Sequence, residues 1–331
     1  MFGLSRKFGG ALRIAAVAVS GLALAGIMTG TMSGAASAED KKLVILGSVP
    51  GLKFPFFVHM MNQIKAEGDK LGVEVIVGDG QVSSTKQTSD VEAAIARKVD
   101  GIVISPNEVD AMAPALQEAV DAKIPVMTID RYVSKVPDLL GHVGADNSKG
   151  GEAQAELIMK LFPNGAKVMN LQGQPGAGPA IDRNKGLHTI LDAHKDKYPI
   201  VFEQTAEFDR VKGLSVTEAA LASMQTPPDV IVAANDDMIL GAMEAVKAHN
   251  LTGKIALIGF DALPEALARV KDGSLTATVE QFPGLQSSKA VDKLIAFLKD
   301  GTKPDPKVEL LTPITITKDN LDKAERLSEI Q

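Results

Sequence analysis

Short apolar runs alternate with amphipathic segments along most of the chain, and this alternation restricts the possible folds more than any other feature. Runs such as 42–48, 101–106 and 254–261 are rich in Val, Ile and Leu and are only a few residues long. Continuous apolar strands between amphipathic helices are typical of parallel sheets that are covered on both faces. The sequence therefore predicts an α/β fold with doubly wound, Rossmann-like parallel sheets.

The alternation occurs as two consecutive sets. The first set runs through residues 42–147, and the second begins near residue 166 and ends with a helix over 284–301. A Pro-rich segment at 302–317 and a short charged tail helix close the chain. Since no low-complexity or disordered linker separates the sets, we expect two lobes of similar size joined by short, ordered crossings.

The first 38 residues have the layout of an export signal. A basic start with Arg6, Lys7 and Arg13 leads into the apolar, small-residue segment 14–28, and a small-x-small site ends at Ala38. This layout predicts a signal peptide over 1–38, cleavage after Ala38 and a periplasmic location. A retained membrane anchor is the alternative, against which the shortness of the apolar segment argues.

Residues 39–331 are acidic and lack cysteine. The whole chain has 35 Lys and Arg against 41 Asp and Glu, and the leader holds three of the basic residues and no acidic ones, so the remainder has a net charge of −9. An acidic chain without a basic cluster argues against nucleic acid and anionic membranes as partners. Without disulfides the fold must rely on its hydrophobic core.

Sequence patterns for cofactors, metals and catalysis are absent. The first predicted strand is not followed by a dinucleotide-binding glycine pattern, and the glycine-rich loop 173–180 lacks the Gly-Lys-Ser/Thr of a phosphate loop. The five histidines show no metal-ligand spacing, and no serine lies in a nucleophile elbow. A glycosidase acid needs a raised pKa, which an arginine beside Asp130 opposes. We expect no cofactor, no metal and no enzymatic activity.

Polar and aromatic residues gather where the predicted strands end. Asp130 and Arg131 follow a strand of the first set, whereas Asn235, Asp261 and Gln281 follow strands of the second. Ligands of open parallel sheets bind at the carboxyl ends of the strands. Carboxylates, amides and a guanidinium group suit the hydroxyls of a neutral polyhydroxy ligand, and flat rings stack on the C–H faces of a sugar.

Each of these residues also has a structural interpretation. Helix capping is the alternative role of Asp130 and Asp261, and a strand-to-helix turn is the alternative for Asn235. A surface salt bridge is the alternative for Arg131. We interpret the acidic pair 236–237 as complementing a helix dipole or lying between the domains, and ligand contact is the alternative.

Seven blocks of sequence carry a resemblance to a known family. In chain order these blocks are PFFV (55–58), TIDR (128–131), VGADN (143–147), EFDRVKGL (207–214), ANDDMILGA (234–242), IGFD (258–261) and TVEQFP (278–283). Over essentially the whole mature chain, their order and spacing resemble those of periplasmic sugar-binding proteins of the ribose/galactose type. These proteins are the solute receptors of ABC importers.

This resemblance implies a type I periplasmic binding protein fold with three crossings between the lobes, near residues 145–146, 281–282 and 309–310. The implied N-terminal lobe comprises 39–145 plus 282–309, and the implied C-terminal lobe comprises 146–281 plus 310–331. It further implies that aromatic rings stack on the ligand and that polar side chains bind its hydroxyls. The stacking residues would be Phe56, Phe57 and Phe208, and the polar ones Asp130, Arg131, Asn235, Asp261 and Gln281.

Two departures from ribose binders bear on the ligand. Phe54 stands where ribose binders often have a polar amide, and Ile181 stands where they have an arginine. Inositol binders place their arginine in an Ile-acid-Arg frame, which resembles residues 181–183 here and makes Arg183 the ligand-binding candidate. A helical surface ion pair is the alternative role for Arg183. The departures favour a cyclitol such as myo-inositol, a polyol or a sugar other than ribose.

The predicted function is that of a monomeric periplasmic receptor that closes over its ligand and delivers it to the permease subunits of an ABC importer. The alternatives are a receptor that presents its ligand to a chemotaxis or quorum-signalling partner, such as a chemoreceptor, and a carbohydrate-active enzyme.

Overall fold

The alternating apolar runs build two parallel sheets in the computed structural model, which describes residues 42–330. The first sheet has six strands in the order β11-β5-β4-β3-β1-β2. Every residue of β3 and β4 is buried, as expected for strands covered on both faces. The strands are β1 (Val44–Val49), β2 (Glu74–Asp79), β3 (Gly101–Ile104), β4 (Val126–Ile129), β5 (Gly141–Ala145) and β11 (Val308–Leu311).

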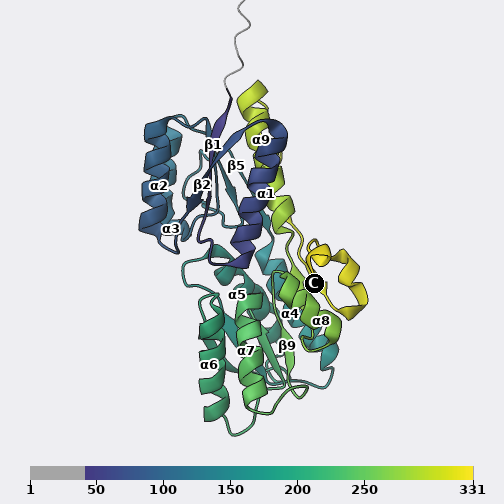
Figure 1. The fold of residues 1–331 in the computed structure, drawn as a ribbon. Coiled ribbons are helices and arrows are strands. Elements are labelled where there is room, and N and C mark those ends of the chain that lie inside the picture. Colours follow the sequence, from purple (N-terminus) through teal and green to yellow (C-terminus); the bar gives the residue numbers. More distant parts are fainter. Residues whose placement is uncertain (1–41, 331) are drawn as a thin grey trace, which may run out of the picture. The chain divides into compact units, whose positions relative to one another are not determined.

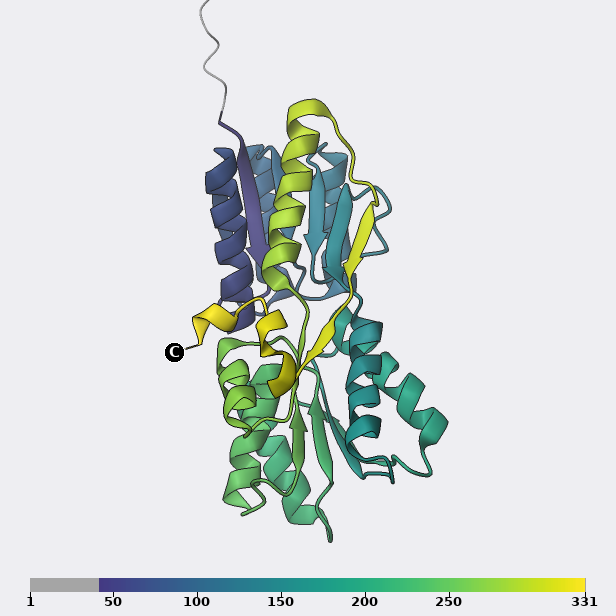
Figure 2. The ribbon, with the colours of Figure 1, turned by 90° about the vertical axis from the view of Figure 1, so that its right-hand side faces the viewer.

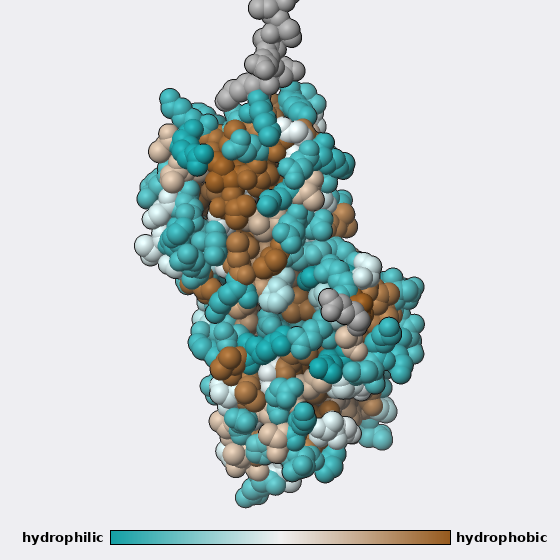
Figure 3. Space-filling model, viewed as in Figure 1, coloured by the Kyte–Doolittle hydropathy of each residue, from teal (hydrophilic) through white to brown (hydrophobic). Residues whose placement is uncertain are grey.

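Two pairs of helices cover the first sheet (Figure 1). One face carries α1 (Pro55–Leu71) with α9 (Pro283–Asp300), and the other carries α2 (Ser84–Arg97) with α3 (Val109–Asp121). We call this sheet and its helices the first lobe. Its edge strand β2 leaves Val77 43% exposed. Figure 3 shows an apolar area over the part of the first lobe where β1 and β2 lie.

The second lobe repeats the same strand pattern. Its four-stranded sheet has the order β7-β6-β8-β9, which corresponds to β2-β1-β3-β4 of the first sheet. The strands are β6 (Val168–Gln172), β7 (Ile200–Thr205), β8 (Val230–Ala233) and β9 (Ala256–Ile258). The helices are α4 (Asn147–Leu161), α5 (Gly178–Leu191), α6 (Arg210–Ser223), α7 (Asp236–Ala248) and α8 (Pro264–Asp272), with a 3₁₀ turn η1 (Asp192–His194) after α5.

Helices α4 and α5 lie unusually close together. A Cβ atom added to Gly151 of α4 would lie 2.0 Å from the carbonyl oxygen of Arg183, and one added to Gly186 of α5 would lie 2.0 Å from that of Ser148. Only glycine allows such an approach of two helix backbones. The contact brings Arg183 next to the start of α4.

The chain passes between the lobes three times. The first passage follows β5, and the second lies between β10 (Thr278–Glu280) of the second lobe and α9 of the first. The third joins β11 to β12 (Ile314–Ile316), which pairs antiparallel with β10 (Figure 2). Leu310 and Leu311 still pair with β5, so the third passage comes later than the predicted position at 309–310. Thr312 and Pro313 separate the two strands, and Pro313 has no N–H to donate to a ladder.

The Pro-rich segment thus contributes two strands that the sequence pattern does not reveal. The charged tail forms the 3₁₀ helices η2 (Lys318–Lys323) and η3 (Leu327–Glu329) instead of the predicted tail helix. These turns pack on α8 and contribute Ala324 to a small apolar cluster. The predicted signal peptide and its cleavage site lie outside the described residues.

Candidate functional site

A cavity lies between the lobes at the carboxyl ends of both sheets. The space in it that the centre of a water-sized sphere can occupy is about 30 Å³. The nine residues predicted as ligand contacts all line it. The full lining is Phe54, Phe56, Phe57, Asp130, Arg131, Gln174, Pro179, Arg183, Phe208, Asn235, Asp237, Asp261 and Gln281.

The first lobe contributes an aspartate and an arginine that are adjacent in sequence. Asp130 follows β4 with a φ of 58°, and the N–H of Arg131 closes a tight turn onto the carbonyl of Ile129 at 2.5 Å. This left-handed backbone directs both side chains away from the sheet. Ser105 Oγ donates to Asp130 Oδ2 at 2.8 Å, Arg131 Nε lies 3.5 Å from the same oxygen, and Arg131 Nη1 donates to the carbonyl of Asn107.

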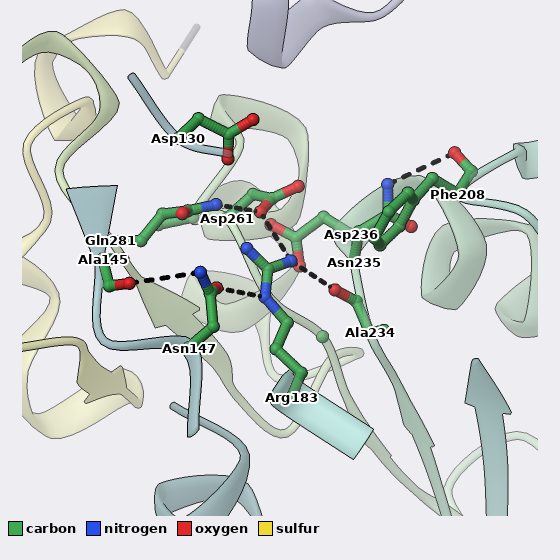
Figure 4. Close-up of polar contacts among 12 residues, drawn as sticks. Asp130, Ala145, Asn147, Arg183, Phe208, Ala234, Asn235, Asp236, Asp261 and Gln281 are labelled. Atoms are coloured by element: carbon green, nitrogen blue, oxygen red, sulfur yellow. Dashed lines mark hydrogen bonds and ion pairs between the residues drawn. The ribbon is translucent and has the colours of Figure 1, made fainter. Parts of the chain in front are cut away.

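The second lobe contributes a matching pair from different elements (Figure 4). Asp261 follows β9, the strand that corresponds to β4, and has a φ of 109°. Its Oδ1 accepts from Gln281 Nε2 at 2.6 Å and lies 3.5 Å from Arg183 Nη1. Both lobes therefore place an Asp–Arg pair against the cavity. The side chains of the two aspartates bond to Ser105, Gln281 and Arg183 and not to the first turn of a helix.

Arg183 is buried and not part of a helical surface ion pair. Its Nε donates to Asn147 Oδ1 at 2.8 Å and its Nη1 donates to the carbonyl of Ala234 at 2.6 Å. Asn147 in turn donates to the carbonyl of Ala145 at the end of β5 (Figure 4). The second-lobe pair thus contacts two of the crossings, through Asn147 at the first and Gln281 at the second.

Aromatic rings enclose the charged groups. Phe56 and Phe57 lie in the first turn of α1, because Pro55 starts this helix at the end of the loop after β1. Their rings meet edge to face at 5.2 Å. The guanidinium carbon of Arg131 lies 5.5 Å from the Phe57 centroid and 6.0 Å from that of Phe208 in the other lobe.

Burial dominates the electrostatics of the two aspartates. It raises the pKa of Asp261 to about 7, against the opposing effects of Arg183 and Gln281. Burial also raises the pKa of Asp130, although Arg131 and Ser105 act to lower it. Arg131 does oppose a raised pKa of Asp130, as the sequence predicts, but desolvation of the carboxylate outweighs this attraction.

Asn235 and the acidic pair after it have structural partners. Asn235 caps α7 by accepting from the N–H of Met238, and its Nδ2 donates to the carbonyl of Phe208 at 3.3 Å. Asp236 is fully buried and accepts from Thr278 and the N–H of Leu263. Asp237 binds Arg210 yet also lines the cavity, which the dipole interpretation of this pair does not include.

Three further lining residues were not predicted as ligand contacts. Gln174 lies in the glycine-rich loop after β6, Pro179 lies in the first turn of α5, and Phe54 precedes α1. The place of this loop at a strand end is the signal in the sequence that could have identified Gln174.

The two lobes are closed over the cavity. Lys53 Nζ of the first lobe lies 3.5 Å from Asp209 of the second, and the N–H of Val109 donates to the carbonyl of Gly176. The charged cavity residues are correspondingly inaccessible, with Arg131, Arg183 and Asp261 each 3% exposed. Within residues 42–330 we find neither a cluster of potential metal ligands nor a helix long and apolar enough to span a membrane.

A family model for the periplasmic binding protein domain matches residues 45–303. The chain belongs to the periplasmic binding protein family. This membership, with the parallel sheets of both lobes, confirms the predicted fold class and the family resemblance.

Relatives of this periplasmic binding protein are sugar-binding proteins. The ribose import binding protein of Bacillus subtilis is 42% identical over 267 residues, which are 78% of this chain and 84% of the relative. The galactofuranose-binding protein of Escherichia coli is 35% identical over 270 residues, 78% of this chain and 81% of the relative.

Among solved structures, a Caulobacter myo-inositol binding protein bound to myo-inositol is 42% identical, with a TM-score of 0.84 over 87% of this chain and 97% of that chain. A solute-binding protein of an ABC transporter from Bacillus halodurans, solved with myo-inositol, is 29% identical, with a TM-score of 0.81 over 87% of this chain and 98% of that chain.

Proposed function

We propose that this protein is the periplasmic substrate-binding component of an ABC importer for a neutral polyhydroxy ligand. The observation that carries the proposal is that each lobe places an Asp–Arg pair against one closed cavity. We call Asp130 with Arg131 the first-lobe half-site, and Asp261 with Arg183 the second-lobe half-site. At this cavity, the buried Nε of Arg131 and Oε1 of Gln281 have no hydrogen-bond partner. Buried polar atoms without partners are costly, and ligand hydroxyls are suitable partners for both a donor and an acceptor.

The charges and the aromatic walls favour a neutral ring with hydroxyls on opposite sides. The arginines of the two half-sites offset the two aspartates, so a ligand with a net charge would be left without a counterion in a buried site. The Phe57 and Phe208 rings suit the C–H faces of a saturated ring. Together with the myo-inositol-bound structures described above, these features make a cyclitol such as myo-inositol the first candidate, followed by pentoses, hexoses and linear polyols.

In this proposal, ligand contacts all nine predicted residues and stabilises the closed state because it binds both lobes at once. The three crossings act as the hinge, with the lobe boundaries near residues 145, 281 and 311. The closed, monomeric protein then docks on the permease in the membrane. The ligand leaves chemically unchanged. Residues 1–38 direct export and are cleaved off after Ala38.

A thermal-shift screen of the mature protein against myo-inositol, D-ribose, other pentoses and hexoses, and small polyols tests this function. A ligand at about 100 times its Kd should stabilise the protein by about 2.7 kcal/mol. Failure of every polyhydroxy compound to raise the melting temperature would contradict the proposal. Mass spectrometry of the recovered ligand should show no conversion, and a converted product would favour an enzyme instead.

A further inference from the structure

A buried glutamine joins helix α2 to the strand ends of the first lobe. The side chain of Gln87 is fully buried, and its amide uses both ends. Nε2 donates to Ser48 Oγ at 3.0 Å and to the carbonyl of Ser105 at 2.8 Å. Oε1 accepts from the N–H of Asn107 at 2.7 Å. The side chain therefore fixes the ends of β1 and β3 to the first turn of α2.

Two of these partners hold the first-lobe half-site. Ser105 donates its hydroxyl to Asp130, and Asn107 accepts from the guanidinium of Arg131. Gln87 itself does not line the cavity. It contacts the residues that bind the two charged groups and not the charged groups themselves. All of these contacts lie within one lobe, so they do not depend on lobe closure.

The second lobe also has a buried glutamine that bonds to strand ends, on α4, although α6 is the helix that corresponds to α2. Gln154 is 2% exposed, and its Nε2 donates to the carbonyls of Ala233 and Gly259, both at 2.9 Å. These carbonyls end β8 and β9 beside the second-lobe half-site: Ala234 binds Arg183, and Gly259 precedes Asp261 by two residues.

We propose that Gln87 and Gln154 are positioning residues, each of which holds the Asp–Arg pair of its lobe in the geometry that binds ligand. The inference rests on the function proposed above. Side chains that are fixed before binding lose less conformational entropy when the ligand arrives, so affinity depends on the shell of residues that holds them. Gln87 carries the stronger case because two separate hydrogen bonds lead from its partners to Asp130 and Arg131.

Gln87→Met tests the inference, since methionine is similar in length and lacks the amide. The probe is myo-inositol, or D-ribose if wild type binds only that, and the readout is Kd by calorimetry well below the melting temperature. We expect Kd to rise about tenfold, the loss that corresponds to one hydrogen bond. Gln154→Met should act similarly from the second lobe. An unchanged Kd in both variants would overturn the inference.

Leu116→Ala is the matched control for loss of stability. Leu116 is fully buried in the α3 face of the first-lobe core, and its side chain has no polar contact with the half-site. This variant should lower the melting temperature and leave Kd within about twofold, since core truncation acts on the folding equilibrium. If Leu116→Ala weakens binding as much as Gln87→Met does, a general loosening explains both and positioning is refuted.

A double-mutant cycle with Ser105→Ala tests whether Gln87 acts on Asp130 through Ser105 or weakens binding by loosening the whole lobe. If Gln87 acts through Ser105 and Asp130, Gln87→Met should cost clearly less affinity in the Ser105→Ala background than in wild type. Strictly additive losses contradict the proposal.

A structure of ligand-free Gln87→Met decides the inference independently of the proposed function. We expect the contact between Ser105 Oγ and Asp130 to be lost and the carboxylate to be displaced. If both remain as in wild type, Gln87 does not position the half-site. Failure of wild type to bind any polyhydroxy compound would refute the function alone, because this structural comparison needs no ligand.

Discussion

The guanidinium carbon of Arg183 lies 3.6 Å from the centroid of the Phe260 ring, the shortest cation–ring distance among residues 42–330. Phe260 is fully buried beneath it. With Asn147 and Ala234 binding its nitrogen atoms, the guanidinium is held on one face and along its edges before a ligand arrives. Arginine suits this place because a planar group can stack and donate in several directions at once.

Arg183→Lys should therefore weaken ligand binding at least tenfold, because an ammonium group cannot replace a stacked, forked donor. Calorimetry with myo-inositol or the best ligand of the screen measures this loss. Arg269→Lys, an exposed change on α8, is the control and should leave Kd unchanged. Equal affinities of Arg183→Lys and wild type would remove Arg183 from the site.

Asp261→Asn should abolish the ligand-induced thermal shift without unfolding the protein. The carboxyl has a pKa raised to about 7 by burial, so its ionised form is costly in the fold and an amide of the same shape removes that cost. We expect a ligand-free melting temperature at pH 8 that is equal to or above that of wild type. A variant that melts much lower would show that Asp261 serves mainly to hold Arg183 in the fold.

The burial of Glu280 at the second crossing predicts that the stability of the protein depends on pH in a specific way. It is fully buried, accepts from the N–H groups of Phe282 and Glu325, and burial raises its pKa from 4.5 to about 7. A carboxyl whose pKa is higher in the folded state binds more protons there, so its contribution to stability is greatest below pH 4.5 and is lost as the pH rises to about 7.

Glu280→Gln removes this dependence. Between pH 4.5 and 7 the free energy of unfolding of the variant should rise by about 3 kcal/mol relative to wild type, as measured by urea titration across the range. The difference between the two profiles cancels contributions of other groups. Parallel profiles would mean that Glu280 is ionised in the fold without cost.

Gly173→Ala should weaken binding through Phe208. A Cβ atom at residue 173 would lie 2.3 Å from two ring atoms of Phe208, so the ring must move from the cavity wall. Gly178→Ala, at the start of α5, meets only Val109 at 3.7 Å and should bind normally. We expect a several-fold rise in Kd for Gly173→Ala alone, and equal affinities of the two variants would show that the Phe208 ring does not contact the ligand.

Lys53 and Asp209 join the lobes at the cavity mouth, and the effect of their ion pair should be small. Lys53 is 58% exposed, so Lys53→Met should raise Kd less than about fivefold, and less still in high salt. Asp209 also caps α6 through the N–H groups of Val211 and Lys212. Asp209→Ala should therefore lower stability by about 1 kcal/mol, whereas Asp209→Ser should largely retain the cap.

The sequence was sufficient for the fold class and for the set of residues that meet at the cavity, because strand ends of a parallel sheet converge by geometry. It was insufficient where tertiary contacts override a local pattern. The Pro-rich segment forms β11 and β12 because β5 and β10 offer free edges, which no periodicity reveals.

The raised pKa of Asp130 and the buried place of Arg183 were also beyond the sequence. Both depend on how tightly the lobes and the helices α4 and α5 close, and residue spacing carries no measure of desolvation. The sequence does not reveal the buried positions of Gln87 and Gln154 for a related reason. A glutamine in an amphipathic helix looks like a solvated residue until its strand-end partners are known.

The repetition of β4 and β9, each ending in a left-handed aspartate, makes recognition modular. Each lobe presents its own acid and its own arginine to one side of the cavity. A substitution in one lobe can therefore alter which hydroxyl pattern is accepted on that side while the opposite half of the contacts persists. Such a receptor can change its specificity one lobe at a time, through substitutions around a lobe's Asp–Arg pair that leave the acid and the arginine in place.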